Sequence, residues 1–311
     1  MFGLVIKNTG SWYEIKTEEG KIVPCKIKGN FRLKGIRSTS PVAVGDRVQV
    51  ELNTDGVVYI YEIEDRKNYI IRKATNLSKQ SHILAANIDV AILIITLKQP
   101  ETSLVFVDRF LATAEAYRIP VIILINKVDL LDETEKQKAK NIVNLYEKIG
   151  YKSIIGSVEE KIGIDKLIDL IKDKIVLVAG NSGVGKSALV NYLVPNANTK
   201  ISPISDVHNT GMHTTTFSEM FFMPCGGAVI DIPGVKGFGT FNFEEYEISH
   251  FFREIFKIGT SCKYSDCKHI NEPGCEVLKA VAEGRINDSR YHSYLNMLED
   301  INEGKYREGE K

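Results

Sequence analysis

One glycine-rich segment limits what this chain can fold into more than any other feature of the sequence. Residues 180–187 read Gly-Asn-Ser-Gly-Val-Gly-Lys-Ser and match every fixed position of the pattern G-x-x-x-x-G-K-[ST]. The apolar run at 175–179 predicts a buried strand before the segment, and 188–193 begins a helix after it. We therefore expect a phosphate-binding loop (P-loop), in which backbone N–H groups and a helix N-terminus face a phosphate chain. The alternative, an ordinary glycine-rich turn, is disfavoured by the complete match and its flanks.

The P-loop pattern assigns roles to individual residues. Lys186 is expected to reach the β- and γ-phosphates, as a binding and a catalytic residue, and the Ser187 hydroxyl is expected to ligate Mg²⁺. The residues predicted to line the phosphate chain are Gly180, Asn181, Ser182, Gly183, Val184, Gly185, Lys186, Ser187 and Ala188.

A second motif, Asn126-Lys127-Val128-Asp129, follows an apolar run at 121–125 and matches N-K-x-D. The Asp129 carboxylate can accept two hydrogen bonds from the N1–H and N2–H₂ edge of guanine. Adenine lacks this donor pair and would leave a buried charge unpaired. Asn126 would hold the loop and reach the base, and the Lys127 stem would pack over the base. A polar turn at a strand end is the alternative, but beside a P-loop the motif predicts GTP and GDP as ligands.

A third motif, Asp231-Ile232-Pro233-Gly234, matches D-x-x-G at the end of another predicted strand. Asp231 would hold the Mg²⁺ shell, and the Gly234 N–H would meet the γ-phosphate. In the run 213–216, Thr215 is expected to offer a second hydroxyl to Mg²⁺, although the sequence does not fix which threonine does so. Both segments are candidate switches that the γ-phosphate orders and hydrolysis releases.

The residue after D-x-x-G is Val235, where many GTPases keep a glutamine that positions the attacking water. Because valine cannot orient water, the hydrolytic residue must come from elsewhere in the chain or from a partner. His213 is the candidate catalytic residue, and a plain loop histidine is the alternative.

The order of the motifs is unusual, because N-K-x-D precedes the P-loop. From residue 87 onward, strands alternate with helices, which predicts a mostly parallel sheet with ligand loops at the strand C-terminal ends. The same sheet forms if the chain is circularly permuted, since permutation at surface termini is tolerated. The segment after Asp231 then runs directly into the C-terminal helices, where a moving switch would pull on them.

The C-terminal part contains the cluster Cys262-x₄-Cys267-x-His269-x₅-Cys275. Three thiolates and one imidazole suit tetrahedral Zn²⁺, and we expect a structural site without a catalytic role. The alternative is a set of reduced structural cysteines beside a chance histidine.

The N-terminal part, from residue 3 to about residue 65, reads as short strands divided by turns. This pattern predicts a compact barrel, most simply an OB-fold. A run of basic residues with one aromatic fits a groove for single-stranded nucleic acid, and a solvated loop is the alternative. The run contains Lys26, Lys28, Phe31, Arg32, Lys34 and Arg37. A further basic stretch at 63–80, which includes Arg66, could contact phosphates or simply be exposed.

Length and composition set the remaining bounds. The chain has 311 residues and a formal net charge of zero, so any nucleic-acid contact must come from local patches. No apolar run is long enough to span a bilayer, and the N-terminus has no signal-peptide pattern, so we expect a cytoplasmic protein. Separately, we expect it to be a monomer. The predicted domains are an OB-fold RNA-binding domain at 1–72, a circularly permuted P-loop α/β GTPase domain at 73–240 and a helical zinc-binding domain at 241–311.

Together these features resemble the RsgA (YjeQ/YloQ) family of circularly permuted GTPases, which act in biogenesis of the small ribosomal subunit. The resemblance rests on the OB-like N-terminus, the permuted motif order, the form G-x-S-G-V-G-K-S, the run H-T-T-T and the Cys/His cluster. There are two departures: the guanine-loop motif S-A-K appears as Gly156-Ser157-Val158, and D-T-P-G appears as D-I-P-G.

The resemblance implies slow GTP hydrolysis that the small ribosomal subunit stimulates. It also implies rRNA contacts through the OB and zinc domains, and release of the protein late in subunit maturation. Two other functions remain open from the residues alone. One is a nucleotide-regulated RNA-binding checkpoint, in which hydrolysis only resets the cycle. The other is a metabolic P-loop ATPase or kinase, against which Asn126-Lys127-Val128-Asp129 argues.

Overall fold

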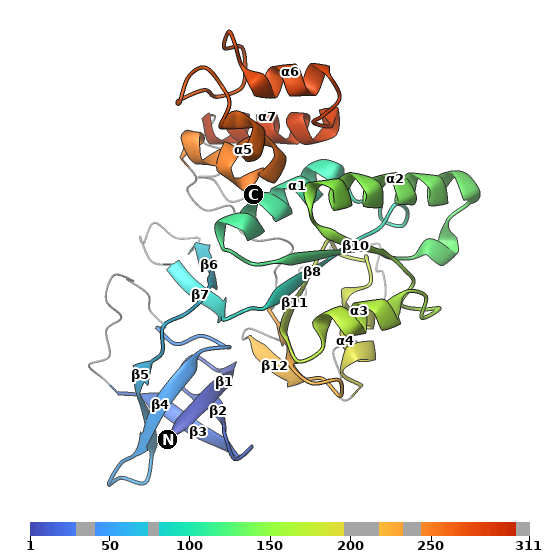
Figure 1. Ribbon diagram of the computed structural model, residues 1–311. Coiled ribbons are helices and arrows are strands. Elements are labelled where there is room, and N and C mark those ends of the chain that lie inside the picture. Colours follow the sequence, from blue (N-terminus) through green and yellow to red (C-terminus); the bar gives the residue numbers. More distant parts are fainter. Residues whose placement is uncertain (29–40, 74–80, 196–217, 233–243, 303–311) are drawn as a thin grey trace, which may run out of the picture.

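The structure is a computed structural model that describes residues 1–28, 41–73, 81–195, 218–232 and 244–302. In Figure 1 a small barrel, an α/β sheet with helices and a group of C-terminal helices follow one another from bottom to top. The three parts lie in the same order as in the sequence.

The N-terminal part is a closed barrel with OB-fold topology, as the sequence predicts. The strands lie in the order β1-β2-β3-β5-β4, and β4 pairs back onto β1. The pair β3–β5 is parallel, and the other pairs within the barrel are antiparallel. Alternation places Tyr13 and Ile15 inside the barrel, because neighbouring residues of a strand face opposite sides. The strands are β1 (Phe2–Asn8), β2 (Tyr13–Thr17), β3 (Ile22–Ile27), β4 (Arg47–Leu52) and β5 (Val58–Ile63).

The central sheet has the order β10-β9-β8-β11-β13-β12. Its strands are parallel except β12, which pairs antiparallel with β13. Every residue of β8 and β9 is buried, which explains why these strands read as unbroken apolar runs. The strands are β8 (Val90–Ile95), β9 (Val121–Ile125), β10 (Lys152–Ile155), β11 (Ile175–Ala179), β12 (Glu219–Phe222) and β13 (Ala228–Asp231).

Helices cover both faces of this sheet. Apolar residues of α1 (Leu104–Ala116) and α2 (Glu133–Ile149) form one core with the sheet, and those of α3 (Ile164–Ile171) and α4 (Lys186–Leu193) form another. The start and end of α2 follow from local chemistry. Asp132 and Glu135 form a capping box at its start, and Gly150 ends it with a φ of 101°.

The sheet confirms the circular permutation that the motif order predicts. The P-loop strand β11 lies between β8 and β13, although β8, β9 and β10 all precede it in the chain. The strand that carries N-K-x-D, β9, lies on the far side of β8 from β11. Because β8, β9, β11 and β13 are parallel, the loops that carry all three motifs leave the same edge of the sheet.

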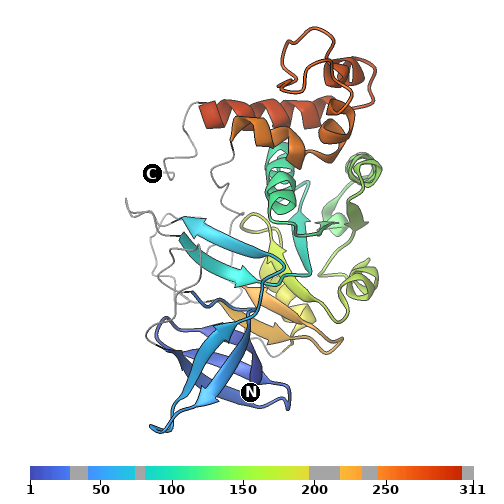
Figure 2. The same ribbon diagram turned by 60° about the vertical axis from the view of Figure 1, so that its left-hand side comes forward.

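The barrel is joined directly to the central sheet. Strand β1 pairs with the edge strand β12, so barrel and sheet form one continuous hydrogen-bonded array (Figure 2). Ile6 of the barrel and Met220 of β12 belong to the same hydrophobic core. A hairpin of β6 (Tyr69–Lys73) and β7 (Ser81–Ala86) connects the two parts along the chain.

The stretch before this hairpin departs from the sequence-based expectation. Arg66 is neither exposed nor free to contact phosphates, because its guanidinium pairs with the buried Asp46 carboxylate at 2.6 Å. It also donates to the Pro41 carbonyl at 2.7 Å. This residue therefore stabilises the junction between the barrel and the hairpin.

The C-terminal helices enclose a core of their own and pack α7 along α1. Phe252 and Tyr294 meet edge to face in this core, with ring centroids 5.6 Å apart. Within the part of the chain that the structure describes, no helix is long and apolar enough to cross a membrane. The elements are the 3-10 helix η2 (Glu245–Phe251), α5 (Arg253–Gly259), α6 (Glu276–Ala282) and α7 (Asp288–Asn302).

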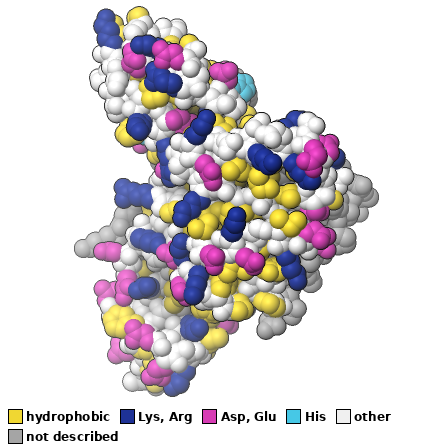
Figure 3. Space-filling model, turned by 45° about the vertical axis from the view of Figure 1, so that its right-hand side comes forward, with side chains coloured by type: hydrophobic (Ala, Val, Ile, Leu, Met, Phe, Trp, Pro, Cys, Tyr) yellow, Lys and Arg dark blue, Asp and Glu magenta, His cyan; other side chains and the backbone are white. Residues whose placement is uncertain are grey.

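The surface carries charges of both signs. On the face shown in Figure 3, basic and acidic side chains are interspersed over the molecule. This distribution agrees with a formal net charge of zero.

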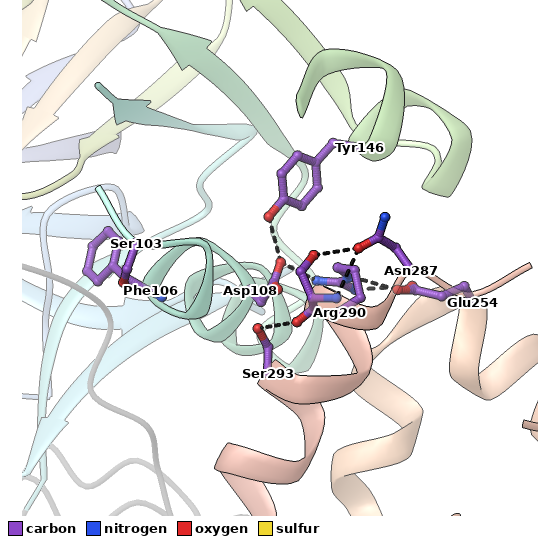
Figure 4. Close-up of polar contacts among 9 residues, drawn as sticks. Ser103, Phe106, Asp108, Tyr146, Glu254, Asn287, Arg290 and Ser293 are labelled. Carbon is purple, nitrogen blue, oxygen red and sulfur yellow. Dashed lines mark hydrogen bonds and ion pairs between the residues drawn. The ribbon is translucent and has the colours of Figure 1, made fainter. Parts of the chain in front are cut away.

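A buried ionic network holds the C-terminal helices on the sheet domain. Figure 4 shows Arg290 of α7 between Asp108 of α1 and Glu254 of α5. Arg290 Nη1 lies 2.7 Å from Asp108 Oδ1, and Nε lies 2.6 Å from Glu254 Oε1. The Tyr146 hydroxyl of α2 donates to Asp108 Oδ1 at 2.7 Å. The C-terminal part thus contacts α1 and α2 on one face of the sheet, whereas the barrel pairs with the edge strand β12.

Candidate nucleotide site and metal centre

The P-loop is closely packed against the rest of the sheet edge. A Cβ atom on Gly180 would lie 2.4 Å from the Ile94 carbonyl oxygen, and one on Gly185 would lie 2.4 Å from Asn126 Nδ2. Both glycines have positive φ values, 142° and 106°, which side chains disfavour. The backbone can therefore curve tightly only because these positions are glycine.

Helix α4 begins at Lys186, directly after the loop, so Ser187 lies in its first turn. Lys186 Nζ donates to the carbonyl oxygens of Gly180 at 2.8 Å and Asn181 at 2.6 Å. The ammonium group thus lies over the loop that the sequence predicts to hold phosphates. The start of α4, the glycine-rich loop and Lys186 lie together. Their backbone N–H groups and the ammonium group provide the donors and the positive charge that a phosphate chain requires.

Asn126 connects three loops at this edge. Its side chain is buried, and Nδ2 donates to the Val184 carbonyl of the P-loop at 2.8 Å. Its Oδ1 accepts from the Val158 N–H at 3.0 Å, in the loop after β10. The segment Gly156-Ser157-Val158 therefore lies against N-K-x-D even though it lacks the S-A-K form.

The other two N-K-x-D side chains lie at the surface beside this junction. Lys127 adopts a left-handed conformation with a φ of 63°, and its Nζ donates to the Gln99 carbonyl. Asp129 lies in a single turn of 3-10 helix (η1, Val128–Leu130), and its side chain is exposed. This position leaves its carboxylate accessible to a ligand over the sheet edge.

The segment after β8 also belongs to this edge, although the sequence analysis did not identify it. In addition to the Gln99 contact with Lys127, Pro100 faces the P-loop, since a Cβ on Gly183 would lie 3.3 Å from its Cδ. Thr102 closes the segment by accepting from the Thr96 N–H at 3.1 Å. Only its position in the chain could have identified this segment from the sequence. It follows the C-terminal end of a buried parallel strand, where ligand-binding loops lie in such sheets.

Asp231 ends β13, next to the P-loop strand β11. Burial raises the pKa of its carboxyl, and the neighbouring Glu219 carboxylate raises it further. No hydrogen bond or ion pair to this carboxylate is found among the described residues. A partly buried carboxylate at the end of the strand beside β11 fits a divalent cation, which would compensate its charge.

Several predicted site residues lie outside the described residues. They are His213, Thr215, Gly234 and Val235, together with Phe31, Arg32, Lys34 and Arg37 of the basic run.

The Cys/His cluster is brought together as the spacing predicts. The ligand atoms of Cys262, Cys267, His269 and Cys275 all lie within 4.8 Å of one another. The sulfur atoms of Cys262 and Cys275 are 3.9 Å apart, and His269 Nδ1 lies 3.6 Å and 3.4 Å from them. Tetrahedral Zn²⁺ with ordinary bond lengths requires about 3.8 Å between sulfurs and about 3.5 Å between sulfur and nitrogen. The donor set and its spacing therefore fit one zinc ion.

Surrounding residues hold this cluster in place. The hydroxyls of Tyr291 and Tyr294 donate to the carbonyls of His269 and Lys268, both at 2.7 Å. Without a bound cation, burial raises the pKa of the Cys267 thiol to about 12. The thiolates of a zinc site therefore require positive charge between them.

Comparisons with known proteins decide the family. Residues 63–241 match the family model described as RsgA GTPase, and residues 2–60 match the RsgA N-terminal domain. The chain belongs to the RsgA GTPase family. It is therefore a GTP-hydrolysing enzyme, and the family implies GTP, GDP and Mg²⁺ as ligands. This result confirms the resemblance drawn from the motifs.

Relatives match over almost the whole chain. A protein of Bacteroides fragilis named "Small ribosomal subunit biogenesis GTPase RsgA" is 61% identical over 307 residues, 99% of each chain. The protein of that name from Porphyromonas gingivalis is 51% identical over 312 residues, again 99% of each chain.

Two solved structures share the architecture. The crystal structure of YjeQ from Thermotoga maritima aligns with a TM-score of 0.78 at 33% identity, covering 96% of this chain and 98% of that one. The crystal structure of YloQ, described as a circularly permuted GTPase, aligns with a TM-score of 0.76 at 29% identity and covers 100% and 96%. The fold of this RsgA-family chain is thus that of its solved relatives.

Proposed function

We propose that this chain binds the small ribosomal subunit, acts late in its maturation and hydrolyses GTP to GDP and phosphate on it. The subunit stimulates hydrolysis, and hydrolysis releases the protein from the subunit. The relatives' names supply the biological setting, biogenesis of the small subunit. The chain's own residues supply the chemistry.

The observation that carries the proposal is the position of Asn126. It links the P-loop to the guanine loop through hydrogen bonds of 2.8 Å and 3.0 Å. A nucleotide at this edge would have its phosphates on the P-loop and its base beside Asp129. Discrimination against adenine then follows from the two donors that only guanine offers to the carboxylate.

Each motif residue receives a role in this proposal. Lys186 stabilises charge on the β- and γ-phosphates, and His213 acts on the attacking water in place of the glutamine that Val235 replaces. Ser187 and Thr215 ligate Mg²⁺, and Asp231 holds its outer shell. The GTP-binding residues are Asn126, Lys127, Asp129, Gly180, Asn181, Ser182, Gly183, Val184, Gly185, Lys186, Ser187, Ala188, Asp231 and Gly234.

The other two parts of the chain would contact rRNA, with the protein acting as a cytoplasmic monomer. On the barrel, Trp12 is 41% exposed and Lys26 Nζ lies 4.3 Å from its ring centroid, a combination suited to base stacking. In the C-terminal part, Tyr246, Phe256 and Lys268 line an open cavity of about 510 Å³. One Zn²⁺ bound by Cys262, Cys267, His269 and Cys275 would stabilise the conformation of the segment that lines this cavity.

Steady-state GTP turnover tests the function. We expect slow turnover by the protein alone and stimulation of at least about tenfold by purified small subunits, because a completed site lowers the barrier by about 1.4 kcal/mol or more. Large subunits and ATP serve as controls and should give no stimulation and no turnover, respectively. His213→Ala should lose most of the stimulated rate while still binding GTP.

Two results would change the proposal. Equal stimulation by large subunits would remove the small subunit as the specific partner. Lys186→Ala protein that still supports subunit maturation in cells would favour the checkpoint function, in which hydrolysis only resets the cycle.

A further inference from the structure

Four charged side chains form a row across adjacent strands, and the row links the barrel to the proposed magnesium site. Glu14 of β2 faces Lys7 of β1, Lys7 faces Glu219 of β12, and Glu219 faces Asp231 of β13. Directly opposite residues in antiparallel strands lie on the same face, with Cβ atoms about 4.5–5.5 Å apart. The charges along the row are therefore negative, positive, negative and negative.

The middle of the row is an ion pair between two parts of the protein. Lys7 Nζ lies 3.0 Å from Glu219 Oε1, and each side chain is 33% exposed. Strand β1 also contacts the start of β12 through the Asn8 N–H, which donates to the Ser218 carbonyl at 3.4 Å. Strand β12 is only four residues long. Its two neighbours within the sheet are the barrel strand β1 and β13.

Without Lys7, Glu219 and Asp231 would be an uncompensated like-charge pair at adjacent strand positions, which is unfavourable. Lys7 neutralises the Glu219 carboxylate from the barrel side. The amount of negative charge near Asp231 then depends on whether the barrel keeps Lys7 in contact with Glu219.

We propose that Lys7 and Glu219 are positioning residues that set how strongly the nucleotide site retains Mg²⁺. With the ion pair formed, only Asp231 contributes a full negative charge to the cation. When a partner displaces β1 from β12, Glu219 is released and its charge adds to that of Asp231. The barrel thereby acts on the nucleotide site without touching the nucleotide. This inference rests on the proposed binding of Mg²⁺ and guanine nucleotide at the P-loop.

Opposite effects of two substitutions are expected. Lys7→Met leaves Glu219 unpaired and should lower the Mg²⁺ concentration for half-maximal retention of GDP by about fivefold, the size expected for a partly screened charge nearby. Glu219→Gln leaves Lys7 unpaired and should raise that concentration by a similar factor. A purely structural role for the ion pair would move both values in the same direction.

The experiment measures release of a fluorescent GDP analogue from the full-length protein over a series of Mg²⁺ concentrations. Lys16→Met is the matched control. Lys16 also reaches β12 from the barrel, with Nζ 3.6 Å from the Phe222 ring centroid, but at the end of the strand away from Asp231. It should leave the Mg²⁺ dependence unchanged within about twofold.

The double substitution tests whether the two charges act on the site through their balance. In the Glu219→Gln background, Lys7→Met should return the Mg²⁺ dependence to within about twofold of wild type, because the double variant lacks both charges. A double variant that kept the shift of either single variant, or an equal effect of Lys16→Met, would overturn the proposal. If wild-type protein retained no guanine nucleotide at any Mg²⁺ concentration, the proposed function would fail as well. Retention by wild type with no difference among variants would overturn only this inference.

Discussion

Removal of the metal from the Cys/His centre is expected to unfold the C-terminal helices while the barrel and the sheet stay folded. Cys275 belongs to the core of these helices, and its sulfur accepts the Leu278 N–H at 3.4 Å, at the start of α6. The stretch between α5 and α6 contains no regular helix or strand, so its backbone lacks the repeating hydrogen bonds of a helix or sheet. Structural zinc sites contribute about 10–16 kcal/mol of apparent binding free energy, which couples directly to folding.

Hydrogen exchange before and after chelation measures this effect. Protection should fall in residues 253–302 and persist in β8, β9 and β11, and elemental analysis of untreated protein should find zinc. Cys275→Ser should reproduce the loss, whereas Cys225→Ser, in the β12–β13 turn outside the cluster, should not. Full protection of the C-terminal helices in zinc-free protein would show that the centre is not a structural metal site.

Arg290→Met is expected to lower the free energy of unfolding by about 3–5 kcal/mol, because it leaves the buried Asp108 carboxylate and the partly buried Glu254 carboxylate without their cation. Arg290 is 1% exposed, and it contacts Asp108 and Glu254 on two different elements. Burial raises the pKa of Asp108, and attraction by Arg290 opposes that shift, so loss of the guanidinium leaves the carboxylate unfavourable in either form.

Urea unfolding of Arg290→Met measures the change. Arg285→Met is the matched control, since Arg285 pairs with Glu283 at the surface and its loss should cost less than about 1 kcal/mol. Additional replacement of Asp108 and Glu254 by Leu should recover much of the lost stability, because apolar residues of similar volume can replace a buried ionic group. Equal destabilisation by Arg285→Met and Arg290→Met would contradict the role assigned to the network.

The sequence predicted the features that depend on local pattern. Each of these features depends on residues close together in the chain. They are the P-loop, the buried strands and the spacing from Cys262 to Cys275. The permuted order of the sheet followed from the order of the motifs, because parallel strands place their loops at one edge. The OB-fold barrel followed from short strands separated by turns.

Contacts between distant segments could not be predicted in the same way. Nothing near Arg290 marks Asp108 as its partner, 182 residues away, and a charged residue in a helix more often faces solvent. Arg66 looked like an exposed linker residue for the same reason, although it pairs with buried Asp46. The pairing of β1 with β12 depends on tertiary structure, since a four-residue strand gives no register from its pattern alone.

The contacts of the C-terminal helices determine how a conformational change at the nucleotide site would reach them. The motif order suggested that a moving switch would pull on this part of the chain. In the structure its contacts reach α1 and the C-terminal end of α2, where Arg253 Nη1 donates to the Gly150 carbonyl. Arg253, for example, pairs with Glu115 of α1 at 2.7 Å. These helices are therefore held on the sheet domain by direct contacts with α1 and α2, in addition to their connection along the chain.

The central claim is that this sheet edge reads guanine through Asp129, and nucleotide affinity of Asp129→Asn tests it most directly. The variant should lose about 100-fold in affinity for GDP and gain a preference for XDP, whose C2 carbonyl accepts from the new amide. Asp169→Asn, which removes the same charge from the exposed face of α3, should bind GDP as wild type does. An unchanged preference for GDP over XDP in Asp129→Asn would contradict the account.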